Sequence, residues 1–156
     1  MDIVINASPL ILLSKIGRLQ LLNNLFESVY VPSAVIQEIN EVGKSKVNLN
    51  QLDFHQLEIA NRLAVLGLLG RLHLGEVEVM VGAIEGHIQT VILDDNAARN
   101  KAKQLGLNVT GTLGILQGAF KKGLVDDLEQ EIMSLRNAGM YLSDALVGML
   151  VSSHGK

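Results

Sequence analysis

The sequence has no cysteine and only two prolines among its 156 residues. Without cysteine there can be no disulfide and no thiol chemistry, and a reducing compartment is the simplest expectation. No apolar run approaches the roughly 18–20 residues that span a bilayer, and the first residues lack the basic segment of a signal peptide. We therefore expect a cytoplasmic protein that makes no membrane contact.

Aromatic residues and positive charge are also scarce. Aromatics make up 3% of the chain, with two tyrosines and three phenylalanines, and the formal net charge is −3. A protein that binds nucleic acid mainly by stacking bases needs more rings, and no overall basic field attracts a polyanion. The hydrophobic content of 48% is that of an ordinary globular protein with an aliphatic core. The length predicts a single domain over residues 1–156.

Short apolar runs alternate with helical patterns along most of the chain. The runs predict strands at residues 3–5, 28–31, 90–93 and 107–110, with a weak edge strand at 55–60. Helices are predicted at residues 9–16, 19–25, 32–42, 61–69, 75–85, 96–105, 111–122, 125–136 and 143–152, and a polar loop at 43–50. This alternation predicts an α/β fold whose parallel sheet is covered by helices on both faces, giving three α/β/α layers.

Two adjacent acids follow the strand predicted at residues 90–93. Ligand groups in parallel α/β sheets lie just past the carboxyl ends of the strands, where this chain has Asp94 and Asp95. One of them is expected to cap the next helix, because Asp is a favoured N-cap. That leaves the other free for chemistry. Asn6 ends the first strand in a similar way, although a polar turn residue would explain it equally well.

Three glutamates and one serine complete the polar candidates. Glu76 lies in the first helical turn, where the helix dipole alone favours a carboxylate, yet it overhangs an apolar part of its helix. Glu38 lies beside an apolar stripe that includes Val35, where a carboxylate is costly unless it is paired or bound to a metal. Glu78 is expected on the solvent-exposed side. Ser8, followed by proline, is predicted to be a helix N-cap.

Taken together, these side chains suggest a divalent-cation site. Carboxylate oxygens that converge on one crevice are the ligands of Mg²⁺ and Mn²⁺, which can activate water and clamp a phosphodiester. Other chemistries have weaker support. The four histidines are too scattered to suggest zinc, and the glycine-containing segment at residues 111–114 lacks the Lys-Ser/Thr ending of a phosphate-binding loop. No serine nucleophile elbow is present.

Four motifs occur in an order that resembles the PIN domain family. They are VINASPLI at residues 4–11, VPSAVIQEI at 31–39, LHLGEVE at 72–78, and LDD at 93–95 with VTGTLG at 109–114. PIN domains form the nuclease fold of many prokaryotic toxins that are paired with antitoxins. The resemblance covers nearly the whole chain and is closest to a branch of stand-alone PIN proteins.

This resemblance implies roles for individual residues. Glu38, Glu76 and Asp94 would be metal-binding acids of the catalytic site, with Asp95 close by as a further metal ligand. Ser8 would orient the first acid or a metal-bound water. The implied activity is Mg²⁺- or Mn²⁺-dependent endoribonuclease action on RNA, as the toxin of a toxin–antitoxin pair, with an antitoxin protein as partner and a homodimer as the assembly.

One departure from the family pattern keeps an alternative open. Asn6 stands where the family has its first Asp, so the catalytic site would lose one negative charge. The chain could then be a catalytically impaired PIN domain that acts as a binding or dimerisation module. A receiver-like phosphoacceptor domain also gathers acids at strand ends, but it needs a late-strand lysine where this chain has Thr110. Aliphatic segments at residues 63–69 and 145–151 exceed what a small core can bury, which favours a dimer.

Overall fold

Five parallel strands form the centre of the protein. The structure is a computed structural model that describes residues 1–41 and 47–153. The strands are β1 (Asp2–Ile5), β2 (Ser28–Pro32), β3 (His55–Leu57), β4 (Thr90–Ile92) and β5 (Asn108–Thr110). Their order is β3-β2-β1-β4-β5, and every neighbouring pair is parallel. The predicted parallel sheet and its weak edge strand are confirmed.

The helices follow the predicted positions, with shifted ends. They are α1 (Ala7–Lys15), α2 (Leu21–Leu25), α3 (Ser33–Ile39), α4 (Arg62–Leu68), α5 (Leu74–Glu85), α6 (Asn96–Gln104), α7 (Thr112–Lys121), α8 (Leu128–Asn137) and α9 (Asp144–Ser153). A short 3-10 helix, Leu49–Gln51, replaces the end of the predicted loop. The rest of that loop up to residue 46, and residue 42 of the predicted third helix, lie outside the described residues.

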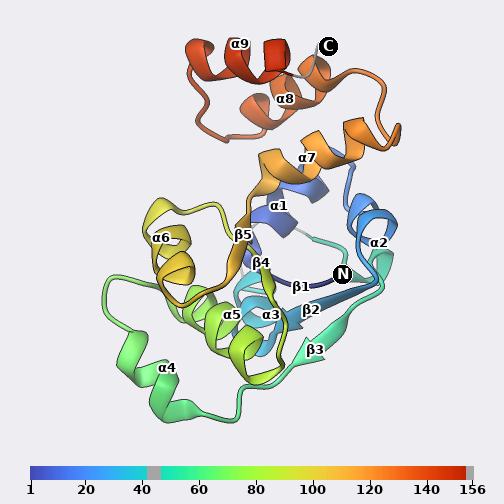
Figure 1. The fold of residues 1–156 in the computed structure, drawn as a ribbon. Coiled ribbons are helices and arrows are strands. Elements are labelled where there is room, and N and C mark those ends of the chain that lie inside the picture. The colour runs from blue at the N-terminus through green and yellow to red at the C-terminus, as the bar shows by residue number, and fades with distance from the viewer. Residues whose placement is uncertain (42–46, 154–156) are drawn as a thin grey trace.

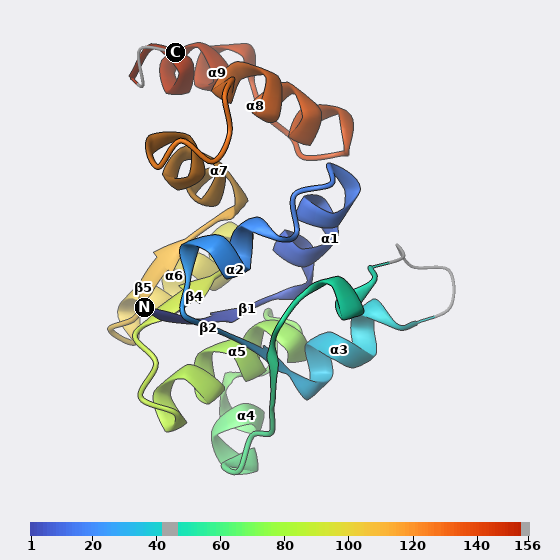
Figure 2. The same cartoon turned by 90° about the vertical axis from the view of Figure 1, so that its right-hand side faces the viewer.

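The helices cover both faces of the sheet. Figures 1 and 2 show α1, α2 and α7 on one face. On the other face α5 packs against β1, β2 and β4 and is flanked by α3, α4 and α6. Beyond α7 lie α8 and then α9, as an outer pair. The three-layer α/β/α architecture is therefore confirmed, with one face extended by two further helices.

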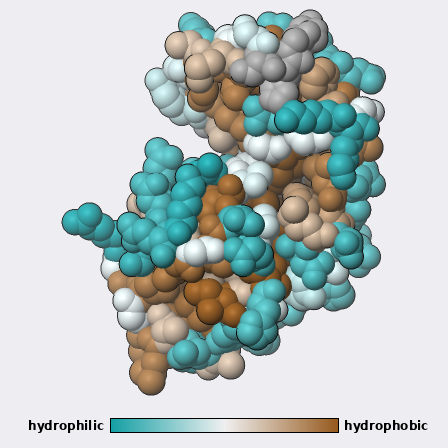
Figure 3. All heavy atoms as spheres, in the orientation of Figure 1, coloured by the Kyte–Doolittle hydropathy of each residue, from teal (hydrophilic) through white to brown (hydrophobic). Residues whose placement is uncertain are grey.

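The core is aliphatic because both faces of the central strands are covered. Ile3, Val4 and Ile5 of β1 are completely buried, and so are the apolar residues at the end of β4. Strands of this kind are continuous apolar runs instead of alternating ones. One apolar face stays uncovered: Leu63 and Leu66 of α4 are 81% and 65% exposed. Hydrophobic side chains gather over the position of α4, at the lower left of Figure 3. Among the described residues, no helix is both long and apolar enough to cross a membrane.

The prediction for Ser8 is wrong in one respect. Helix α1 begins at Ala7, so the N-cap is Asn6, whose side chain makes no capping hydrogen bond. The helix starts earlier because β1 runs directly into it, and proline is tolerated within a first turn, where backbone N–H groups have no helical partner. Ser8 therefore lies inside the helix, and its hydroxyl is available for another contact.

Candidate active site

The candidate site lies at the carboxyl edge of the sheet, between β1 and β4. The chain leaves β1 toward β2 on one side, while β4 pairs with β1 on the other. Such a switch point is where ligands bind in parallel α/β sheets. Ile5 pairs with Ile92, and the Asn6 N–H extends this pairing by donating to the Ile92 carbonyl at 3.1 Å. Asp94 lies two residues beyond the end of β4, one position further than Asn6 in this register.

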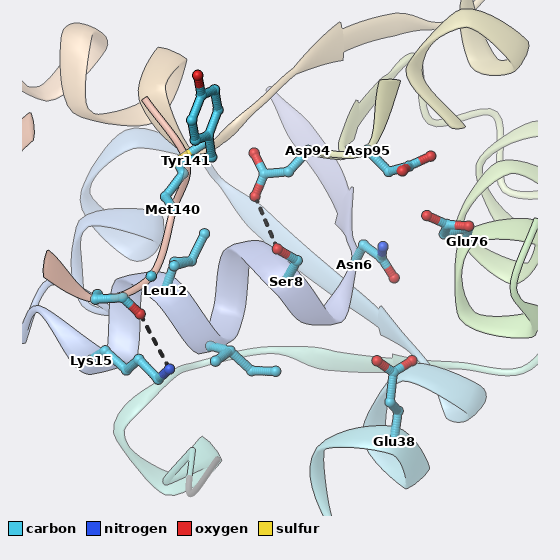
Figure 4. A pocket seen from close by; sticks show the side chains of 13 residues that line it. Asn6, Ser8, Leu12, Lys15, Glu38, Glu76, Asp94, Asp95, Met140 and Tyr141 are labelled. Atoms are coloured by element: carbon cyan, nitrogen blue, oxygen red, sulfur yellow. Dashed lines mark hydrogen bonds between the residues drawn. The ribbon is translucent and has the colours of Figure 1, made fainter. Parts of the chain in front are cut away.

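A cleft of about 550 Å³ opens at this edge. Its walls come from the ends of β1 and β4, from α1, α3 and the start of α5, and from the segment between α8 and α9. All six predicted site residues line it: Asn6, Ser8, Glu38, Glu76, Asp94 and Asp95. Figure 4 shows these side chains around one open space. The structure therefore brings together residues that the sequence spreads over 90 positions, from 6 to 95.

Asp94 is held in place by several hydrogen bonds. Its Oδ1 accepts from the Thr112 backbone N–H at 2.8 Å, and its Oδ2 accepts from the Thr112 hydroxyl at 2.7 Å. The Ser8 hydroxyl donates to the same Oδ2 at 3.3 Å (Figure 4). A Cβ on Gly111 would lie only 2.9 Å from Asp94 Oδ1, so glycine allows this approach. This role of Thr112 was not predicted, although Thr112 lies in the VTGTLG motif at residues 109–114.

Asp95 is the one of the two adjacent acids that caps the next helix, as expected for one of them. Its Oδ2 accepts a hydrogen bond from the Ala98 N–H at 3.0 Å and caps α6. The carboxylate nevertheless remains exposed and lines the cleft. Asp94, which makes no cap for α6, is the half-buried acid nearer the centre of the sheet edge.

Asn6 and Glu38 meet at the first turn of α5. A Cβ on Gly75 would lie 3.2 Å from Glu38 Oε1 and 3.4 Å from Asn6 Oδ1. Both oxygens therefore face the small space that this glycine leaves open. Asn6 is only 7% exposed, and its Oδ1 has no hydrogen-bond partner within the described part of the chain. Since buried acceptors normally have partners, this oxygen is suited to a ligand from the cleft.

Glu76 accepts a hydrogen bond at the start of its helix and also lines the cleft. Its Oε1 accepts from the His73 N–H at 2.9 Å, which satisfies a free donor at the start of α5. The side chain is 7% exposed and also lines the cleft. Figure 4 shows its carboxylate directed into the open space, toward Asp95.

The prediction that Glu78 faces solvent is wrong. The side chain is buried, with only 4% exposure, instead of facing solvent. Its Oε1 accepts from the Ala34 N–H at 3.0 Å, and its Oε2 accepts from Arg62 Nη1 at 2.8 Å. The prediction failed because α3 and α4 cover the side of α5 that was expected to be wet. Glu78 thus joins three helices and does not line the cleft.

The far wall of the cleft comes from the α8–α9 connection and was not anticipated. Residues 138–141 line it, next to Lys15 of α1. Lys15 Nζ donates to the Ala138 carbonyl at 3.3 Å. On the other side of the wall, Arg136 Nε donates to the Leu142 carbonyl at 2.9 Å. No local pattern marks this segment, because its position depends on contacts between the two ends of the chain.

The side chains of the cleft match a hard divalent cation in chemical type. Four carboxylates and one unpartnered amide oxygen line the space, and oxygen ligands are those preferred by Mg²⁺ and Mn²⁺. Within residues 1–41 and 47–153, no three Asp, Glu, His or Cys side chains are already gathered as an ion-binding cluster. Mg²⁺ usually keeps several waters and takes one or two carboxylates, so a spread set of acids fits it.

A family model described as a PIN domain matches residues 2–156. The chain belongs to the PIN domain family. Its fold is therefore of the nuclease type. No match was found among curated proteins or among solved structures.

Proposed function

We propose that this PIN domain is an endoribonuclease that hydrolyses phosphodiester bonds of RNA with Mg²⁺ or Mn²⁺. The observation that carries the proposal is the cleft itself. Glu38 from α3, Glu76 from α5 and Asp94 from the connection between β4 and α6 all line it, together with Asn6, whose side-chain oxygen has no partner in the described structure. Carboxylates that share a site repel one another unless a cation lies between them, and the glycine at position 75 leaves room beside Glu38 and the Asn6 amide.

In this proposal, Glu38, Glu76, Asp94 and the Asn6 amide hold the ion, with Asp95 beside them. The ion supplies an activated water and neutralises charge on the reacting phosphate. The protein fixes its own ligands in advance. Ser8 and Thr112 donate to Asp94 and hold its carboxylate in one orientation. The His73 N–H does the same for Glu76.

The test is cleavage of single-stranded RNA by the purified protein with Mn²⁺. We expect cleavage that stops with EDTA and falls at least about a hundredfold in Glu76→Gln, since a group that positions the reacting atoms contributes on this scale. Glu58→Gln is the matched control, because Glu58 hydrogen-bonds to Ser33 outside the cleft. Cleavage that persists in EDTA, or in Glu76→Gln, would contradict the proposal.

A second candidate function is favoured by Asn6. Replacing a carboxylate by a neutral amide removes one full charge from the site, so the domain could bind RNA or protein without turnover. Asn6→Asp separates the two candidates. Activity that is absent in the wild type and present in Asn6→Asp would identify a disabled enzyme in an intact site. Activity in the wild type would show that the amide oxygen is sufficient.

We also propose that residues 1–156 act as one cytoplasmic domain and form a homodimer. The support for a dimer is the exposed apolar face of α4, formed by Leu63 and Leu66. Such patches mark interaction sites in soluble proteins. An antitoxin protein is an alternative occupant of this face, as for a toxin of a toxin–antitoxin pair. A mass measurement of the purified chain alone distinguishes the two, because only the homodimer forms without a partner.

A further inference from the structure

Tyr141 stands out among the aromatic residues of the chain. It is 89% exposed, whereas the other tyrosine and the three phenylalanines are all at least partly buried. Tyr30, for comparison, packs its ring against His55 at a centroid distance of 5.1 Å. Tyr141 lines the cleft that contains the acids, and Figure 4 shows its ring at the rim, on the Asp94 side.

The backbone that carries Tyr141 is fastened on both sides. Before it, the Ala138 carbonyl accepts from Lys15 of α1. After it, the Leu142 carbonyl accepts from the Arg136 guanidinium, which also pairs with Asp144 at 2.8 Å. The ring is thus presented to the cleft by a fixed segment and gains no burial of its own. A rigid, exposed aromatic side chain loses little conformational freedom when a partner stacks on it.

The negative charge of the cleft favours base stacking over charge attraction as the way to bind a nucleic acid there. Among the residues that the structure describes, its lining has four carboxylates and one cation, Lys15. Even with a divalent ion bound, this wall offers little attraction to the phosphates of a nucleic acid. Stacking between a base and an aromatic ring does not depend on the sign of the surrounding field, and it accepts any base because every base has a flat face.

We propose that Tyr141 binds single-stranded RNA by stacking on one base, next to the phosphodiester that lies over the acids. Lys15, beside this wall, has two further N–H groups to offer a phosphate oxygen. The apolar side chains of Leu12 and Met140 line the same cleft and give the base an apolar surrounding. This inference rests on the proposed function for its substrate class, and its test uses binding instead of cleavage.

The experiment measures the affinity of the full chain for a fluorescein-labelled single-stranded oligoribonucleotide, with Ca²⁺ in place of Mn²⁺. Tyr141→Ala is expected to weaken binding about tenfold, within the range for loss of one stacked base, while Tyr141→Phe stays within about twofold. A matched oligomer without bases reports on phosphate contacts alone, and its affinity should be the same for wild type and Tyr141→Ala. Circular dichroism melting shows that each variant is folded.

A spectroscopic signature is available because the chain has no tryptophan. Tyr141→Trp places a single indole at the cleft, and its fluorescence should be quenched when the oligoribonucleotide binds. Leu66→Trp is the control, since Leu66 lies on the exposed face of α4, at the opposite end of the molecule (Figure 1). Its fluorescence should not change.

Several outcomes would overturn the inference: no RNA binding by the wild type, equal affinity of wild type and Tyr141→Ala, equal losses toward the oligomer without bases, or an indole at position 141 that does not respond. Failure of the proposed function would look different. If the protein binds RNA through Tyr141 but does not cleave it, the stacking inference holds and the proposed nuclease activity is wrong. RNA cleavage and RNA binding that are both unchanged in Tyr141→Ala would support the nuclease and rule out the stacking inference.

Discussion

Asn6 is the residue whose replacement tests the proposed chemistry most directly. Its buried Oδ1 has no partner in the described structure and faces the same space as Glu38 Oε1. In Asn6→Asp, a new carboxylate would lie close to an existing one. Without metal we expect a loss of about 1–3 kcal/mol in the free energy of unfolding. With Mn²⁺ the added charge should raise metal affinity about tenfold or more.

Calorimetric titration with Mn²⁺ and thermal melting in EDTA check this prediction. Asn6→Ala is the control, because it removes the amide oxygen without adding charge and should weaken Mn²⁺ binding. An Asn6→Asp protein whose Mn²⁺ affinity equals that of the wild type would show that position 6 does not contact the ion.

Glu76 and Glu78 lie two residues apart on α5 and are expected to behave oppositely. Glu78→Ala removes the acceptor for the Ala34 N–H and the partner of Arg62, so the melting temperature should fall. The cost is about 2 kcal/mol, below the range for breaking a fully buried pair, since the Arg62 side chain is 53% exposed. Activity per folded molecule should survive. Glu76→Ala should lose activity with a smaller change in stability.

Chemical denaturation and single-turnover cleavage on the same two proteins give the comparison. Glu78→Gln, which keeps an acceptor oxygen, should recover part of the stability lost in Glu78→Ala. A Glu78→Ala protein that is stable but inactive would place this side chain in the chemistry after all.

Among the elements, α5 contributes its first turn to the wall of the cleft. Gly75 lies in its first turn, with Glu38 Oε1 and Asn6 Oδ1 at 3.2 Å and 3.4 Å from the place of a Cβ. Gly75→Ala should leave the helix as stable as before or slightly more so, because alanine is the better helix former. The methyl group would occupy the space between the oxygens, so Mn²⁺ affinity and cleavage should both fall.

Mn²⁺ titration beside thermal melting tests this, with Gly67→Ala in α4 as the control, since a Cβ there meets nothing within 4 Å. The prediction fails if Gly75→Ala binds Mn²⁺ as tightly as the wild type, because the oxygens would then not define the ion's position.

Helix α8 is fastened to the rest of the fold by an ion pair. Arg18, which follows α1, donates to both oxygens of Glu131 at 2.8 Å and 2.7 Å. This hydrogen bonding raises the pKa of Arg18 above its ordinary value, although burial works in the opposite direction. Because the folded-state pKa is raised, the stabilisation is complete below the pKa of an unfolded arginine and is lost only as pH rises through the folded value.

We therefore expect Arg18→Gln to lose about 1 kcal/mol of unfolding free energy, as for a partly exposed charged pair, and to lose the same amount at pH 6 and pH 9. Urea denaturation of both proteins at the two pH values measures this. A loss that disappears at either pH would mean that another titrating group controls the contact.

Local patterns predicted the elements well and their surroundings poorly. The strands that supply Asn6 and Asp94 are short, continuous apolar runs followed by polar residues, so their position and the edge where they end followed from sequence. Ser8 was misassigned because the start of α1 depends on how β1 ends. Glu78 and Tyr141 could not be placed, since the first depends on what covers α5 and the second on a segment that packs against α1 from the far end of the chain.

For the whole molecule, the uncovered face of α4 is the surface on which the proposed homodimer can be tested. If this face joins two copies, Leu66→Lys should turn the homodimer into a monomer, because a buried ammonium without a partner is costly, while the melting temperature of the folded monomer changes little. Light scattering coupled to size exclusion measures the mass.

Met149→Lys is the matched control, since Met149 is 64% exposed on α9, at the opposite end of the molecule (Figure 1). A dimer that survives Leu66→Lys and is lost in Met149→Lys would move the interface to the C-terminal helices.

The contact between Lys15 and the Ala138 carbonyl spans 123 positions of sequence, which has a consequence during synthesis. A domain generally folds as one unit during synthesis, so it needs most of its chain outside the ribosome first. A nascent chain that has emerged through Thr112 already carries Asn6, all four carboxylates and the hydroxyl that holds Asp94. Tyr141 and its wall come only later. A chain truncated in between would lack the wall that carries Tyr141 and also α7, whose Ile115 and Leu116 belong to the core. We therefore expect the site residues to take up their arrangement only after the last helices have been made.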